Sequence, residues 1–133
     1  HLADQDTWTS RDHRLVQPAD IYATLLDILG TERPSTASWG QSIIDPDNAG
    51  RLTCAASCHD GQRAIRTAAW YLRQNGSEEM ELFVKPDDRW EVNEVSDRCH
   101  DVAEALAEYL DQFQTAAAGN HRQQLPSLPS DLA

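Results

Sequence analysis

The feature that most constrains the fold is a long amphipathic run, "SDRCHDVAEALAEYLDQFQ", at residues 96–114. Ser96 or Asp97 is predicted to cap this helix, because either side-chain oxygen can accept from the free amides of the first turn. A helix with a single apolar stripe must cover another apolar surface, so the chain needs a second layer. The large apolar residues of the stripe recur at helical spacing: Val102, Leu106, Tyr109, Leu110 and Phe113.

A hairpin supplies that layer. The stretch "RAIRTAAWYLRQNGSEEMELFV" contains two strand-like runs, Arg63–Arg73 and Met80–Val84, separated by Asn75-Gly76. Asn-Gly between two apolar runs is a strong hairpin signal, because both residues accept the positive φ of a tight turn. Alternation places Trp70 and Leu72 on one face, which we expect to lie under the helix.

A second helix is predicted at "PADIYATLLDILG", residues 18–30. Pro18 suits the first helical position, and Gly30 suits a left-handed stop. Its apolar side chains require a partner surface, so we expect this helix either to repack on the sheet or to mediate self-association. These side chains are Ile21, Leu25, Leu26, Ile28 and Leu29.

The charge balance limits the partners. The chain has 133 residues with 11 basic and 22 acidic side chains, a net charge of −11. Neither nucleic acid nor an anionic membrane is expected as the main partner, because both require a basic patch. No apolar run is long enough to span a bilayer. The first residue is His1 and no signal-peptide pattern follows, so we expect the chain to be part of a longer protein.

The acidic stretch "ELFVKPDDRWEVNEVSDRC", residues 81–99, resembles a metal or acid/base site at first sight. Calcium-loop spacing from Asp87 fails, because the third, sixth and twelfth positions are Arg89, Val92 and Arg98. Nothing in the pattern predicts the burial that would separate the pKa values of two carboxyl groups. We therefore interpret the stretch as a structural corner between a strand and a helix, fixed by Asn93 and the carboxylates.

The segment "CAASCHDG", residues 54–61, offers a different chemistry. Its cysteines and histidine could join a distant Cys-His pair in a zinc or redox module, since two to four residues between cysteines suit zinc. The alternative is that the cysteines pack as small apolar groups. The candidate ligands are Cys54, Cys58, His59, Cys99 and His100. No phosphate-binding glycine loop and no complete catalytic centre is present.

Four stretches, in order, resemble the C-terminal part of the formylglycine-dependent type I sulfatases of the alkaline-phosphatase-like superfamily, in a branch common among planctomycetes. "VQPADIYATLLDILG" is similar to the helix that closes the large catalytic domain. "WGQSIIDP" resembles a Gly-basic-Ser-Leu segment, with Gln41 in place of the usual Arg. "RAIRTAAWYLRQNG" and "ELFVKPDDRWEVNEVSD" resemble the following strands and the corner before the last helix.

The resemblance implies an α+β fold with a small antiparallel sheet of about four strands under a long C-terminal helix. It divides the chain into the last loop and helix of the catalytic domain (1–30), a connector (31–60), the C-terminal subdomain (61–118) and a flexible tail (119–133). It also implies a substrate-cleft wall, with His59, Asp60 and Arg63 in a loop near bound substrate.

The family's chemistry lies outside this chain. Sulfatases make formylglycine from the Cys or Ser of C/S-x-P-x-R and hold a divalent cation, usually calcium, with Asp and Asn; the chain has no such motif. The implied partners are therefore an N-terminal catalytic domain and, through it, a sulfate ester. Many relatives are exported, which is compatible with a periplasmic or secreted parent, but the sequence itself does not fix the compartment. The alternatives are the Cys/His module and a non-catalytic interaction domain that retains the fold of a lost enzyme.

Overall fold

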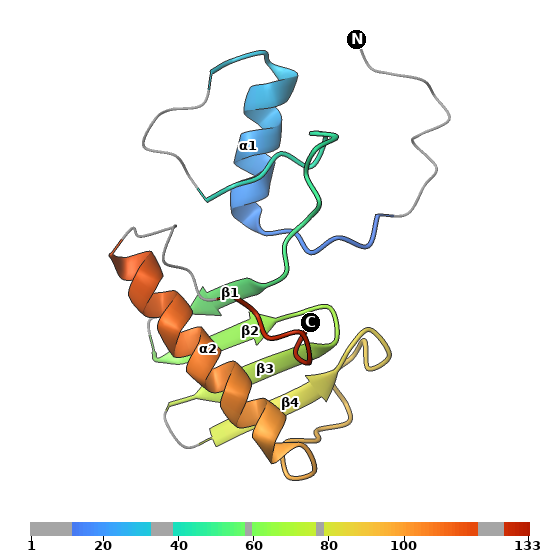
Figure 1. Cartoon of the computed structure of the whole chain (residues 1–133), viewed down its shortest axis with the longest axis vertical. Helices are drawn as coiled ribbons and strands as arrows, with labels where there is room; N and C mark the ends of the chain where they lie inside the picture. The colour runs from blue at the N-terminus through green and yellow to red at the C-terminus, as the bar shows by residue number, and fades with distance from the viewer. Residues whose placement is uncertain (1–11, 33–38, 58–59, 77–78, 120–126) are drawn as a thin grey trace.

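A computed structural model describes residues 12–32, 39–57, 60–76, 79–119 and 127–133. The α+β prediction is confirmed: a four-stranded antiparallel sheet in the order β1-β2-β3-β4 lies under a long C-terminal helix (Figure 1). A shorter helix, α1, lies beyond the β1 edge of the sheet. The elements are α1 (Pro18–Ile28), β1 (Cys54–Ser57), β2 (Gln62–Arg66), β3 (Trp70–Asn75), β4 (Glu79–Val84) and α2 (His100–Ala118).

The sheet contains one more turn than the sequence pattern suggests. The Asn75-Gly76 hairpin is confirmed, with Gly76 at φ 74° and Leu72 opposite Leu82. The single predicted strand Arg63–Arg73 is wrong, because the chain reverses between β2 and β3. Thr67 closes this reversal: its N–H donates to the Trp70 carbonyl oxygen at 2.9 Å, and its Oγ1 accepts from the Trp70 N–H at 3.0 Å.

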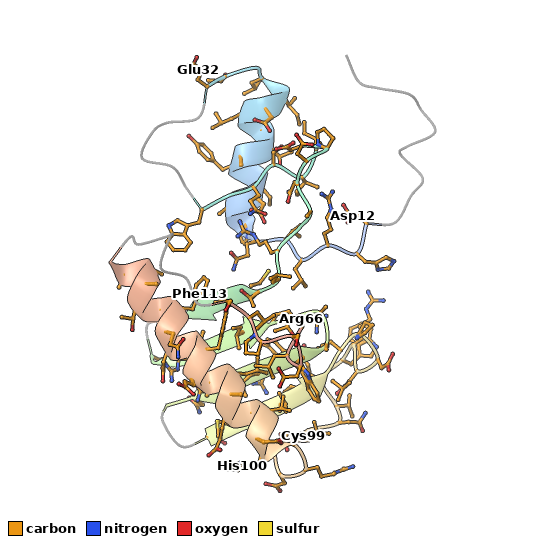
Figure 2. The ribbon with its side chains drawn as sticks, viewed as in Figure 1. Asp12, Glu32, Arg66, Cys99, His100 and Phe113 are labelled. Atoms are coloured by element: carbon orange, nitrogen blue, oxygen red, sulfur yellow. The ribbon has the colours of Figure 1, made fainter. Side chains whose placement is uncertain are left out.

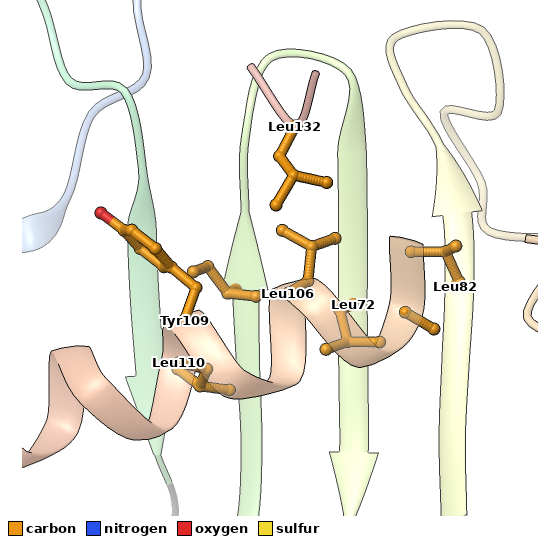
Figure 3. Packing of buried hydrophobic residues seen from close by; sticks show 8 residues of the cluster. Leu72, Leu82, Leu106, Tyr109, Leu110 and Leu132 are labelled. Atoms are coloured by element: carbon orange, nitrogen blue, oxygen red, sulfur yellow. The ribbon is translucent and has the colours of Figure 1, made fainter. Parts of the chain in front are cut away.

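The core lies between α2 and the sheet (Figure 3). Leu106 and Leu110 of α2 and Leu72 and Leu82 of the sheet are all 0% exposed. Full burial of a leucine side chain stabilises a fold by about 1.5–3 kcal/mol, so this cluster dominates the stability of the sheet and helix. Leu132, predicted to lie in a flexible tail, is 1% exposed within the same cluster.

The predicted helix cap at Ser96 or Asp97 is wrong. The N-cap of α2 is Cys99, without a side-chain cap hydrogen bond. A backbone turn precedes the helix, in which the Val95 carbonyl oxygen accepts from the Arg98 and Cys99 amides at 3.0 Å each. This turn delays the first helical residue to His100.

Helix α1 is not repacked on the sheet, although that was one of two expectations for it. Ile21, Leu25 and Ile28 are 59%, 51% and 58% exposed. The predicted stop is confirmed by Gly30, whose φ of 63° is costly for any residue with a Cβ. Within the described part of the chain, neither helix has the length and apolar character needed to cross a membrane.

Candidate functional site

The residues predicted to approach substrate lie near the start of β2. Asp60 is exposed in the turn before the strand, and His59 falls outside the described residues. Arg63 points to the α2 side, where its guanidinium pairs with Asp111 and donates to Gln114 Oε1 at 3.1 Å. Arg63 therefore lies in strand β2, not in a loop as predicted, and its guanidinium is engaged by α2. Of the predicted residues that the structure describes, this leaves Asp60 as the exposed charged group before β2.

The Cys/His candidates occupy two separate elements. Cys54 begins β1, with its Sγ 3.6 Å from the Val16 carbonyl oxygen, and burial raises the pKa of its thiol. Cys99 packs against the core before α2, and His100 Nε2 lies 3.2 Å from Glu104 Oε1 (Figure 2). Across the ranges that the structure describes, no three metal-ligating side chains gather. Cys58 and His59 lie outside those ranges, so the module stays a prediction.

The acidic stretch after β4 forms a corner, as the sequence indicates. Asp88 accepts from the Val92 and Asn93 amides at 3.0 and 2.8 Å, and these bonds lower the pKa of its carboxyl group. Glu94 accepts from the Leu82 and Ser96 amides at 2.9 and 2.6 Å. The carboxylates thus serve as acceptors for backbone N–H groups, and Asn93 contributes its backbone amide.

A buried polar network fixes the described residues before β1, 12–32 and 39–53, which we call the N-terminal segments. The sequence pattern did not predict this network. Asp20 is 2% exposed and accepts from the Gln17 and Gln41 amides at 2.8 and 2.7 Å. Its carboxylate also pairs with Arg51, with Nε 2.8 Å from Oδ2. Hydrogen bonding to the Arg51 guanidinium holds the pKa of Asp20 at about 2, against the burial that would raise it. A charge-assisted pair of this kind is strong and directional.

Thr24 extends the network to the connector. Its hydroxyl donates to the Asp20 carbonyl oxygen at 2.6 Å and accepts from the Ile43 amide at 3.0 Å. Arg14 reaches the same connector, where Nη2 donates to the Ile43 carbonyl oxygen at 3.0 Å. One side of α1 is therefore held by polar contacts.

The other side of α1 carries a patch of exposed apolar side chains, which we call the α1 apolar surface. It consists of Ile21, Leu25, Ile28 and Leu29, the last being 73% exposed. The spacing of these residues along one helix brings them to one face. Contiguous exposed apolar patches of this kind mark interaction sites.

A recess separates the N-terminal segments from α2. It has a volume of about 350 Å³, and its lining includes Trp39, Arg51, Tyr109 and Phe113. The rings of Trp39 and Phe113 meet across it, with centroids 6.1 Å apart. The recess joins residues distant in sequence, so no local pattern could have revealed it.

Comparison with known proteins supports the fold resemblance. No protein-family model matches the chain, and no curated protein matches it in sequence. Among solved structures, a Bacteroides thetaiotaomicron sulfatase, described with the metabolism of multiple glycosaminoglycans and designated 6S-sulf, matches with a TM-score of 0.57 at 20% identity. The match covers 72% of this chain and 24% of the sulfatase chain. The chain therefore spans about a quarter of its neighbour's length and shares its fold over most of its own.

Proposed function

We propose that this chain is the C-terminal subdomain of a sulfatase, an enzyme that hydrolyses sulfuric esters, and that it has no catalytic activity by itself. The observation that carries the proposal is the shared fold with a sulfatase over 72% of the chain. The four sequence stretches that resemble this family, in the family's order, point the same way. Fold alone does not imply function, so the proposal also depends on what the chain offers a partner.

What the chain offers is a docking surface. We assign the α1 apolar surface to contact with the catalytic domain, because Leu25 and Leu29 are 51% and 73% exposed while the opposite side of α1 is fixed by Asp20 and Arg51. Covering four large apolar side chains would stabilise the joined protein by several kcal/mol, at about 25 cal/mol for each Å² buried. The turn before β2, which contains Asp60, would then form part of the wall of the substrate cleft.

In this proposal the catalytic groups belong to the rest of the parent protein. Formylglycine would supply the nucleophile for attack on the sulfate ester sulfur, and a calcium ion would stabilise negative charge there. The contribution of this chain is to fix the catalytic domain and to shape the cleft.

The test begins with the gene upstream of His1. A C/S-x-P-x-R motif with metal-binding acids is expected, and its absence would contradict the enzyme and favour a non-catalytic interaction domain. The parent should hydrolyse an aryl sulfate, or a carbohydrate 6-sulfate like that implied by the neighbour's designation. Replacement of the motif's Cys or Ser by Ala should abolish turnover, and this chain alone should show none.

The α1 apolar surface also supports the second candidate, an interaction domain that associates with copies of itself or with another protein. Light scattering and binding of an apolar dye separate self-association from association with another protein. A monomer that binds no apolar dye argues against self-association. The Cys/His module is tested on the same sample by elemental analysis. A chain purified at neutral pH without zinc or another transition metal would remove that alternative.

A further inference from the structure

The sheet has a second face, opposite α2, that neither helix packs against in the described part of the chain. One transverse row of residues crosses this face, which we call the Arg66 row. Strand register places Cys54 beside Arg66, Arg66 beside Tyr71, and Tyr71 beside Phe83. The row projects away from α2, because the adjacent residues Ile65, Leu72 and Leu82 belong to the core under that helix.

Arg66 stands out within this row. The residue is half-buried, and its Nη1 atom is buried without a hydrogen-bond partner (its position is labelled in Figure 2). A buried cation without a partner is unfavourable, and in this chain of net charge −11 carboxylates are plentiful. Four other arginines each pair with a carboxylate: Arg14 with Asp12, Arg51 with Asp20, Arg63 with Asp111, and Arg73 with Glu81.

The nearby acidic group is already engaged. Glu91 Oε1 lies 3.0 Å from Lys85 Nζ, which also donates to the Asp88 carbonyl oxygen at 2.6 Å and sits 5.6 Å from the Tyr71 ring centroid. Burial lowers the pKa of Arg66, and the charges of Cys54 and Glu91 oppose this shift. Glu91 is thus paired with Lys85 and forms no ion pair with Arg66 among the described residues.

We propose that the Arg66 row is a second docking site, at which Arg66 receives an Asp or Glu carboxylate from the catalytic domain. This inference rests on the proposed function, which supplies the partner. A protein surface fits better than a free anion, since Arg66 lies between the half-buried side chains of Cys54 and Tyr71, which a small anion would leave uncovered. The row is also continuous with the N-terminal segments, because Cys54 Sγ lies 3.6 Å from the Val16 carbonyl oxygen.

The first experiment compares thermal unfolding of this chain as wild type, Arg66→Met and Arg73→Met. Arg73 lies on the same face but is exposed and paired with Glu81, with Nε 2.7 Å from Oε2, so it is a matched control. Arg66→Met should leave the midpoint unchanged or raise it, because a buried unpaired charge is removed. A clear fall would mean that Arg66 has a partner within this chain and would overturn the inference.

The second experiment places the same substitutions in the full-length parent. There Arg66→Met should lower the midpoint by roughly 2 °C or more, because the carboxylate loses its cation and the shift per kcal/mol falls with chain length. Arg66→Lys should recover part of this loss, and Arg73→Met should change little. Equal midpoints for wild type and Arg66→Met in an active sulfatase would overturn the docking role and leave the proposed function intact. A parent without sulfatase activity would overturn the proposed function instead, whatever the midpoints show.

A third measurement separates a protein carboxylate from a free anion. Sodium sulfate and sodium acetate are added to the wild-type chain and to Arg66→Met, with sodium chloride at matched ionic strength. The wild-type and variant midpoints should respond alike. Stabilisation of the wild type alone would identify a small-anion site and overturn the docking proposal.

Discussion

The N-terminal segments and the sheet with α2 place their polar and apolar groups in opposite ways. Around α1 the interior is largely polar, with Asp20 and Ser42 buried beside Ala23 and Arg51 paired to Asp20, while large apolar side chains lie on the surface. Under α2 the interior is a cluster of leucines with an isoleucine, an alanine and a tyrosine, and the acidic residues of α2 face outward. The sheet and α2 therefore have the organisation of a self-sufficient domain, and the N-terminal segments have that of an interface.

The difference identifies what each region contributes. A helix that exposes its apolar stripe and buries its polar side is stable only through specific hydrogen bonds, because burial of apolar area contributes little to it. Among the described residues few contacts link the two regions, one of them being Gln17 Nε2 donating to the Ala55 carbonyl oxygen at 3.0 Å. We therefore expect the two regions to respond separately to substitution.

The largest effect is expected from Asp20→Asn. The neutral amide of this variant cannot balance the charge of Arg51, whose side chain is 12% exposed, and an unpaired buried charge costs about 3–5 kcal/mol. Hydrogen exchange should show loss of amide protection across α1 (Pro18–Ile28), with the amides of β3 unchanged.

The control for this variant is Asp47→Asn, an exposed carboxylate in the same region. It should leave exchange within α1 as in the wild type. A cooperative loss of protection in both α1 and the sheet after Asp20→Asn would show that the two regions are one folding unit, contrary to the comparison.

A matched pair of leucines gives the next effect. Leu106→Ala removes a 0% exposed side chain from the core and should cost about 2–5 kcal/mol in denaturant unfolding. Leu25→Ala, at a position 51% exposed, should change the free energy of unfolding by only about 0.5 kcal/mol. In the full-length parent the Leu25 cost should rise, because the proposed contact would bury that side chain. Equal costs in this chain would remove the contrast between the regions.

The sequence predicted the elements that depend on local pattern. The apolar stripe of α2, with Leu106 and Leu110, was predicted because its spacing repeats within one helix. The Asn75-Gly76 turn was predicted because its signal lies within one hairpin. Strand β1 was not identified, since "CAAS" has no β-branched or aromatic residue and lies within the range interpreted as a connector. The prediction of the helix cap was wrong because a preceding backbone turn pairs the Arg98 and Cys99 amides, which a side chain was expected to bind.

The site was less predictable, for a physical reason. The α1 apolar surface follows from helical spacing, but exposure depends on what the rest of the fold covers. Arg51 reaches Asp20 across 31 positions, a pairing that only the tertiary fold creates. Alternation along β2 predicts that Arg66 and Ile65 point to opposite faces of the sheet. Nothing in that pattern reveals that the Nη1 atom of Arg66 is buried without a hydrogen-bond partner.

The last effect is a pH dependence confined to the N-terminal segments, and it is smaller than the expected cost of Asp20→Asn. The pKa of Asp20 is about 2, below its ordinary 3.8, so the ionised form is favoured by folding. Its stabilisation is complete above about pH 4 and is lost as the pH falls through about 2, an effect of roughly 2 kcal/mol. Urea unfolding and exchange of the α1 amides should therefore weaken over this range in the wild type. Asp20→Asn, which cannot titrate there, should show a flatter dependence, and parallel pH profiles for the two proteins would contradict the assigned role of Asp20.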